Sequence, residues 1–178
     1  YIREGDAFQI VISNCLKATF EGNLIGTYGR IRAMNPSPYM FYFSGDELEV
    51  AGASPESLVK LRNGILQTFP LAGTMPRGKD MQEDQDMEIK LMSDPKELAE
   101  HSMLVDLGRN DLGKVSRLGS VEVEKYMQVE RFSHVMHITT RVTGEMKDDK
   151  DNLDALCSIF PAGTLSGAPK IRACEIID

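Results

Sequence analysis

Two carboxylates spaced three residues apart are the first feature of the sequence that could do chemistry. Glu97 and Glu100 stand in a predicted helix, where residues three apart share one face, so their oxygens can converge. Carboxylate oxygens without neighbouring thiolates suit a hard cation such as Mg²⁺, which completes its shell with water and substrate oxygens. An acidic face exposed to solvent is the more common explanation of such a spacing. The apolar run from Met103 to Leu107 argues against it, because a fully exposed helix would not carry that run.

Two segments rich in glycine and small residues could bind an anion. Residues 160–169 lead into a predicted helix, and Gly163, Thr164 and Ser166 could hold a carboxylate or a phosphate near its start. Residues 70–78 form a similar loop, in which Arg77 is available to pair with a carboxylate. An ordinary turn explains either loop equally well when it is taken alone.

Histidines are the third candidate group. His134 and His137 lie in a predicted strand, and side chains three residues apart on a strand point to opposite faces, so only one of them can reach a given site. An imidazole transfers protons near neutral pH, although a histidine in a strand is more often structural.

The composition narrows the class of protein. A length of 178 residues fits one domain, and a net charge of -7 argues against a nucleic-acid partner, whose phosphates need a basic face. No apolar run is long enough to span a membrane, so we expect no membrane insertion. The three cysteines form no CxxC pair, which argues against a disulfide framework or a zinc site and favours the cytoplasm.

The elements that must position these residues can be read from periodicity and turn signals. Helices are expected at 24–34, at 81–111 with a break at Asp94-Pro95, and at 151–159. Strands are expected at 8–12, 39–43, 48–51, 121–129 and 134–144, with a hairpin at 58–66 around Asn63-Gly64. The strand at 8–12 is expected to be buried on both faces, because its apolar residues fall on both parities. Antiparallel strands with helices grouped between them predict an α+β fold.

Six segments taken together resemble the chorismate-utilising enzymes, and among them the first component of anthranilate synthases. They follow the family's order along the whole chain: 35–40, 52–56, 70–74, 99–101, 105–111 and 163–170. The resemblance implies a four-layer α/β/β/α sandwich of large, mainly antiparallel sheets. It also implies that residues 1–178 are the central part of a chorismate-binding catalytic domain, with segments missing before and after, and that this piece is inactive alone.

The resemblance further assigns roles to particular residues. It implies that Glu100, with Glu97 close by, binds Mg²⁺, and that His137 and Glu56 are catalytic, Glu56 protonating the C4 hydroxyl of chorismate as it leaves. The substrate-binding residues implied are Gly73, Thr74, Gly163 and Thr164. Feedback tryptophan is expected to contact Pro38, Tyr39 and Met40, within the segment that begins at Asn35.

Two positions indicate which reaction of the family to expect. Gln9 stands where isochorismate synthases carry a lysine that activates water, and Ala72 stands where aminodeoxychorismate synthases carry a nucleophilic lysine. Neither an amide nor a methyl group can act as base or nucleophile. Direct attack of ammonia on C2, followed by loss of pyruvate, would yield anthranilate, the ammonia coming from a glutamine amidotransferase subunit. An aminodeoxychorismate synthase and a non-catalytic module that binds tryptophan remain the alternatives.

Overall fold

The computed structural model describes residues 1–34 and 36–178. Asn35, the first residue of the expected tryptophan segment, therefore lies outside the described residues. The chain divides into two compact units: unit 1 consists of Tyr1–Ile12 and Leu58–Asp178, and unit 2 of Ser13–Ser57. Each unit has its own secondary structure.

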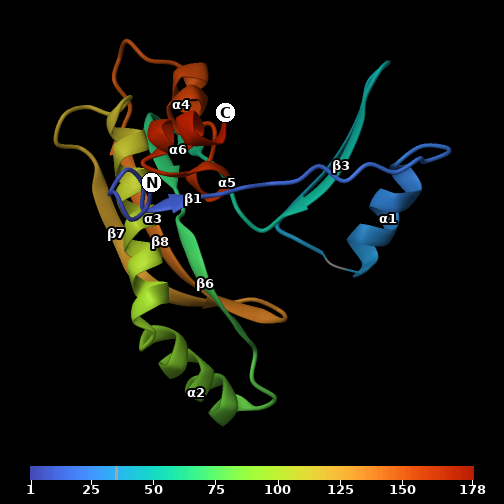
Figure 1. The fold of residues 1–178 in the computed structure, drawn as a ribbon, viewed down its shortest axis with the longest axis horizontal. Helices are drawn as coiled ribbons and strands as arrows, with labels where there is room; N and C mark the ends of the chain where they lie inside the picture. The colour runs from blue at the N-terminus through green and yellow to red at the C-terminus, as the bar shows by residue number, and fades with distance from the viewer. Residues whose placement is uncertain (35) are drawn as a thin grey trace. The chain divides into compact units, whose positions relative to one another are not determined.

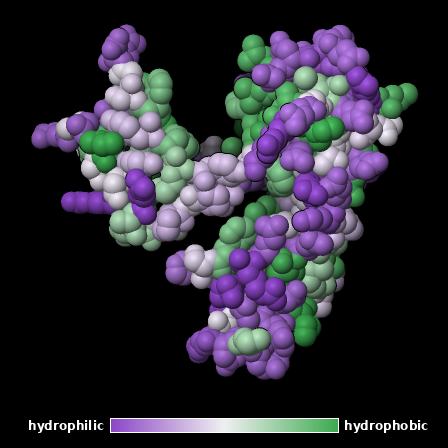
Figure 2. Space-filling model, turned by 180° about the vertical axis from the view of Figure 1, so that it is seen from behind, coloured by the Kyte–Doolittle hydropathy of each residue, from purple (hydrophilic) through white to green (hydrophobic). Residues whose placement is uncertain are grey.

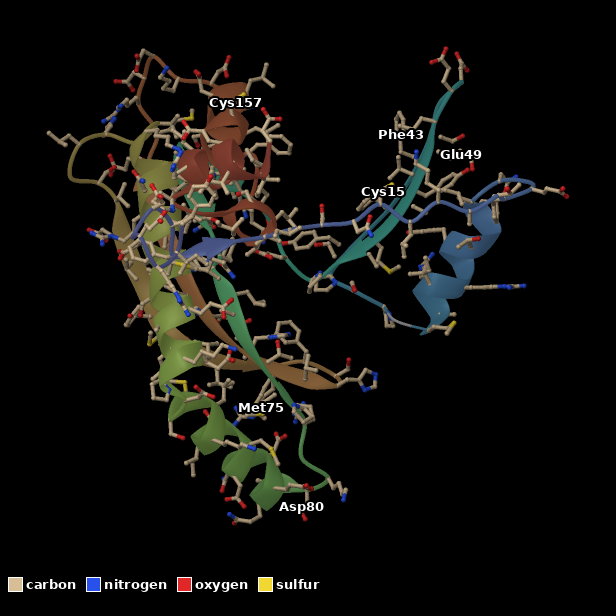
Figure 3. All side chains as sticks on the ribbon, viewed as in Figure 1. Cys15, Phe43, Glu49, Met75, Asp80 and Cys157 are labelled. Carbon is tan, nitrogen blue, oxygen red and sulfur yellow. The ribbon has the colours of Figure 1, made fainter. Side chains whose placement is uncertain are left out.

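Unit 2 contains one helix and one hairpin. Helix α1 (Ile25–Met34) is followed by the antiparallel strands β2 (Tyr39–Ser44) and β3 (Glu49–Ser54). The Glu49 carboxylate accepts hydrogen bonds from the Leu24 amide at 2.6 Å and the Tyr42 hydroxyl at 3.0 Å, and Figure 3 shows its place on the hairpin. These bonds lower the pKa of Glu49, the Leu24 amide having the largest effect, and they tie the start of the helix to the hairpin.

Unit 1 is built on a five-stranded antiparallel sheet. Its strands are β4 (Lys60–Arg62), β5 (Ile65–Thr68), β6 (Leu71–Pro76), β7 (Glu122–Arg131) and β8 (Val135–Glu145). Strand β8 is central: β7 pairs with it along one edge, and β5 and β6 pair with successive stretches of it along the other. The β4–β5 turn contains Asn63 and Gly64 with φ of 52° and 76°, which confirms the hairpin expected from the Asn-Gly pair.

Two helices follow the sheet's first strands and pack on it (Figure 1): α2 (Met81–Met92) and α3 (Pro95–Gly113). The side chains of Asp80 and Asp94 cap them by accepting hydrogen bonds from first-turn amides, so the predicted break at Asp94-Pro95 is confirmed. The core between helices and sheet has two clusters. One centres on Leu66, Val105, Leu112 and Val142, and the other on Leu91, Met136 and Ile138.

The last part of unit 1 comprises α4 (Asn152–Ile159), α5 (Gly163–Ser166), β9 (Gly167–Ala168) and α6 (Lys170–Ile177). Lys170 is buried and its Nζ donates to Asp111 Oδ2 at 2.6 Å, joining α6 to α3. Strand β1 (Gln9–Ile10) pairs antiparallel with β9. Gly167, at φ of 131°, allows this pairing, since a Cβ there would lie 2.2 Å from the Gln9 carbonyl oxygen.

The expectation that residues 8–12 form a strand buried on both faces is wrong. Phe8 is 78% exposed and Ile12 is 86% exposed. The strand is only two residues long, and within the described part of the chain it pairs with β9 alone.

The α+β class is confirmed by antiparallel sheets with helices grouped between β6 and β7. Among residues 1–34 and 36–178, no helix has the length and apolar character needed to cross a bilayer. On the face drawn in Figure 2, hydrophilic residues surround smaller hydrophobic patches.

Candidate active site

A cavity of about 350 Å³ in unit 1 brings together residues that lie far apart in the sequence. They come from β1, β6, α3 and α5. The lining residues are Gln9, Leu71, Ala72, Gly73, Thr74, Glu97, Glu100, Leu104 and Thr164. The cavity thus collects both predicted metal ligands and three of the four predicted substrate-binding residues.

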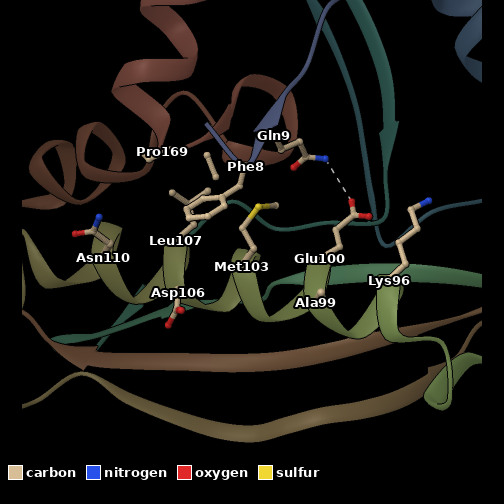
Figure 4. A pocket seen from close by; sticks show the side chains of 11 residues that line it. Phe8, Gln9, Lys96, Ala99, Glu100, Met103, Asp106, Leu107, Asn110 and Pro169 are labelled. Carbon is tan, nitrogen blue, oxygen red and sulfur yellow. Dashed lines mark hydrogen bonds between the residues drawn. The ribbon is translucent and has the colours of Figure 1, made fainter. Parts of the chain in front are cut away.

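Helix α3 supplies both carboxylates. Glu97 lies in the capped first turn and Glu100 three residues later on the same face, while Leu104 and Val105 are buried against the sheet. Gln9 Nε2 donates to Glu100 Oε1 at 3.4 Å, as the dashed line in Figure 4 shows. Among the described residues, none is a hydrogen-bond partner of the buried Gln9 Oε1, which is therefore a polar atom still able to accept a hydrogen bond beside Glu100.

Gly73 forms a bulge in β6. The register against β8 shifts between Ala72 and Thr74, and Gly73 has φ of 67°, a conformation that favours glycine. A Cβ on Gly73 would lie 3.0 Å from Leu91 Cδ1 and 3.4 Å from Glu97 Oε2. The glycine therefore turns the backbone and leaves space beside the Glu97 carboxylate.

The bulge also orients His137, which lies opposite Thr74 in the β6–β8 pairing. His137 Nδ1 lies 2.9 Å from the Gly73 carbonyl oxygen and 3.2 Å from Thr74 Oγ1. Because a carbonyl oxygen can only accept, the geometry places a proton on Nδ1, and in neutral imidazole Nε2 is then a proton acceptor. His137 does not line the cavity itself but contacts two residues that do. His134 precedes β8 and is exposed.

The predicted glycine-rich loop reaches the cavity through Thr164 only. Gly163 is buried against α3, where a Cβ would lie 1.8 Å from Leu107 Cδ2. In unit 1 as described, Gly163 therefore allows α5 to approach α3 and does not line the cavity. Arg77, which was expected to be available for pairing with a carboxylate, pairs with the carboxylate of Asp84 in the same unit.

The donor set beside the cavity fits Mg²⁺ better than zinc. In the described part of the chain, no group of three or more His, Cys, Asp or Glu side chains could hold a metal. Two carboxylates on one helical face, with room left by Gly73, match a cation that takes few protein oxygens and keeps water or substrate oxygens. Zinc sites typically need three or four nitrogen or sulfur ligands.

Four predicted site residues belong to unit 2. Burial raises the pKa of the Glu56 carboxyl, which is half-buried, and its amide donates to Ser54 Oγ at 3.2 Å. Pro38 and Tyr39 are exposed and Met40 is half-buried at the start of β2.

A second groove, of about 630 Å³, runs along α3 next to the cavity and shares Gln9 and Glu100 with it. Figure 4 shows Glu100, Met103 and Leu107 projecting from α3 toward the segment that carries Phe8 and Gln9. The lining of the groove combines apolar side chains with Lys96, Asp106 and Asn110. Sequence periodicity did not indicate the groove, because Phe8 comes from a distant segment.

His101 is a buried group that sequence reasoning did not single out. Its side chain has no exposed surface, and Nε2 lies 2.6 Å from Thr140 Oγ1, which also accepts from the Met127 amide at 2.9 Å. Burial lowers the pKa of His101 to about 4, so the imidazole is neutral at neutral pH. The apolar residues after it in α3 were the available signal that this face is buried.

This chain is similar in sequence to known proteins over nearly all of its length. Anthranilate synthase component 1 of Acetivibrio thermocellus is 54% identical over all of this chain, and that of Streptomyces coelicolor is 56% identical over 99% of it. The chain spans 36% and 35% of the length of these two relatives.

Solved structures of related enzymes also resemble this chain in fold. Anthranilate synthase component I from Streptococcus pneumoniae matches with a TM-score of 0.88 and 47% identity, over 99% of this chain and 38% of that one. The menaquinone-specific isochorismate synthase from Escherichia coli matches less closely, with a TM-score of 0.62 and 27% identity over 71% of this chain and 29% of that one. The chorismate binding enzyme family matches residues 1–178 without interruption, and the chain therefore belongs to that family.

Proposed function

We propose that the protein carrying this chain converts chorismate and ammonia to anthranilate and pyruvate, the first step of tryptophan biosynthesis. Residues 1–178 would form the central part of its chorismate-binding catalytic domain. The observation that carries the proposal is the shared cavity, where Glu97 and Glu100 of α3 face Gly73 and Thr74 of β6. Relatives named anthranilate synthase component 1 support the choice of reaction.

Glu100 and Glu97 are proposed to hold Mg²⁺. The bound cation would neutralise a carboxylate of chorismate as charge shifts during the reaction. The chain's own part is to orient the ring: the bulge at Gly73, the hydroxyl of Thr74 and Thr164 line the same cavity and can contact the substrate. Gly163 contributes by letting α5, which carries Thr164, approach α3.

Two groups are proposed to move protons. His137, with a proton on Nδ1 held by the Gly73 carbonyl, offers Nε2 to accept the C2 proton. Glu56 is proposed as the acid that protonates the departing C4 hydroxyl, and the raised pKa of its carboxyl favours the protonated form that this step needs.

We propose that the residues lining the cavity determine that ammonia is the nucleophile. Ala72 is buried and lines the cavity with a methyl group, and Gln9 offers an amide. Neither forms a covalent bond to the ring or deprotonates water. Ammonia therefore adds at C2 directly, and we propose that a glutamine amidotransferase subunit supplies it.

We propose that tryptophan regulates the complete protein by binding to unit 2. Tryptophan is proposed to bind at Pro38, Tyr39 and Met40, where a proline-containing segment enters β2.

We propose that the protein works in the cytoplasm. Cys15, Cys157 and Cys174 are free thiols, which supports a reducing compartment.

The test uses the complete protein with chorismate, ammonium and Mg²⁺ at mildly alkaline pH, and follows anthranilate fluorescence with and without tryptophan. We expect fluorescence that requires Mg²⁺ and decreases with tryptophan. Consumption of chorismate without anthranilate would instead indicate 4-amino-4-deoxychorismate or isochorismate as product. No consumption would indicate a module that only binds tryptophan.

A further inference from the structure

A buried carboxylate outside the cavity fastens three elements of unit 1 together. Asp84, near the start of α2, is only 8% exposed. Arg77, which follows β6, donates to it from Nε to Oδ1 at 2.9 Å and from Nη2 to Oδ2 at 2.8 Å. The Gly78 amide donates to Oδ1 at 2.7 Å, and Arg131 at the end of β7 places Nε 3.3 Å from Oδ2. These bonds hold the pKa of Asp84 at about 2, chiefly through Arg77.

The same guanidinium reaches the turn that precedes His137. Arg77 Nη1 donates to the Phe132 carbonyl oxygen at 2.7 Å, and the Arg77 amide donates to the His134 carbonyl oxygen at 3.1 Å. The Phe132 ring meets the imidazole of His137 edge-on, with centroids 5.5 Å apart and planes at 63°. The imidazole of His137 therefore has two fixed contacts: the ring of Phe132 and the hydrogen bond to the Gly73 carbonyl oxygen.

We propose that the Arg77–Asp84 pair is a positioning device for His137, acting through Phe132 to keep the imidazole Nδ1–H hydrogen-bonded to the Gly73 carbonyl oxygen. The catalytic consequence rests on the role of His137 in the proposed function, but the positioning itself does not. The guanidinium of Arg77 suits this role because it is planar and can donate two hydrogen bonds to the Asp84 carboxylate and a third to the Phe132 carbonyl oxygen.

The approach of the Arg77 segment to α2 leaves little freedom for the pair to relax. A Cβ on Gly78 would lie 2.2 Å from the Asp84 amide nitrogen, so only glycine fits where the chain leaves β6. Because Arg77 and Gly78 both bind Asp84, a change at this carboxylate is transmitted to the Phe132 turn rather than absorbed in the loop.

The test reads the tautomer of His137 directly, in the complete protein labelled with ¹⁵N-histidine. The spectra are recorded at mildly alkaline pH, and the ¹⁵N shifts distinguish a protonated from an unprotonated ring nitrogen of histidine. A His137→Gln variant assigns the signal. We expect the wild type to carry the proton on Nδ1, and Asp84→Asn and Arg77→Lys to shift the signal toward a mixture of tautomers. Phe132→Leu, which removes only the ring contact, should produce the same shift.

The matched control is Asp80→Ala, which removes the cap of the same helix but leaves the Arg77–Asp84 pair intact. This variant weakens α2 and should leave the His137 signal unchanged. An equal shift in Asp80→Ala would show a merely structural effect and overturn the proposal. So would an unchanged signal in either Asp84→Asn or Phe132→Leu.

Activity provides a second measurement that separates the two proposals. If the complete protein makes anthranilate, Asp84→Asn should lower kcat by about 10-fold or more while the KM for chorismate changes by less than about threefold. An unchanged kcat beside a shifted tautomer would overturn the catalytic consequence. If the wild type makes no anthranilate, the proposed function fails, and the ¹⁵N signals alone decide whether the pair positions His137.

Discussion

Lowering the pH should destabilise unit 1 through His101. Its imidazole is buried, and burial lowers its pKa from 6.5 to about 4. Between these two values the unfolded chain binds a proton that the folded chain does not, so the free energy of unfolding falls as the pH falls. Each pKa unit corresponds to about 1.4 kcal/mol, and a group with these two pKa values loses about 2 kcal/mol of stability between about pH 7 and pH 5.

The measurement is urea unfolding followed by far-UV circular dichroism in Mg²⁺-free buffer at a series of pH values. The comparison variant is His101→Gln, which cannot titrate. Its absolute stability should be lower, because it disturbs the bond to Thr140, but its dependence on pH should be flatter than that of the wild type by about 2 kcal/mol over this range. His134→Gln is the control, because it removes an exposed imidazole instead of a buried one.

The reasoning would be refuted by equal pH slopes in the wild type and in His101→Gln. It would also be refuted if His101→Gln lost more stability than the wild type as the pH falls from 7 to 5, because that would require the folded chain to bind the His101 proton more tightly than the unfolded chain.

Three further predictions concern the site and the core. Glu100→Gln should abolish Mg²⁺-dependent anthranilate formation while the far-UV spectrum stays that of the wild type; retained activity would contradict the metal assignment. Leu112→Ala empties a position with no exposed surface in the larger core cluster and should lower the free energy of unfolding by about 2 to 5 kcal/mol in urea titrations; a loss below about 1 kcal/mol would mean the core closes around the gap. Asp84 should stabilise the fold above about pH 4, and that stability should disappear as the pH falls toward its folded pKa of about 2; acid titration of Asp84→Asn should lack this step.

Local signals in the sequence predicted most of the elements. Asp94-Pro95 marks a capped helix start, and Asn63-Gly64 marks a two-residue turn, because each pair favours one backbone geometry whatever surrounds it. The strand at 8–12 was misjudged for the opposite reason. Whether Phe8 and Ile12 are covered depends on which layers lie against the strand, and no local pattern determines that.

The site was predictable only in part. Spacing brought Glu97 and Glu100 together on one helix face, but it could not add Gln9, Gly73 and Thr164, which stand in three other segments. The family resemblance named most of these residues as a group, and the structure places them around one cavity. The family resemblance did not indicate that Gly163 packs against α3 instead of lining the cavity, because a glycine has no side chain whose chemistry would distinguish the two roles.

The rotational setting of α3 links the buried core to the site. Neighbouring residues on a helix point about 100° apart, so Glu100 and His101 cannot share an environment. His101 is fixed toward the sheet by Thr140, and Leu104 and Leu112 are buried along the same helix. With that face held against the sheet, Glu100 must project away from it toward Gln9. The apolar and imidazole contacts of α3 therefore decide where the carboxylates point, and a change that rotates the helix would remove the site without touching either carboxylate.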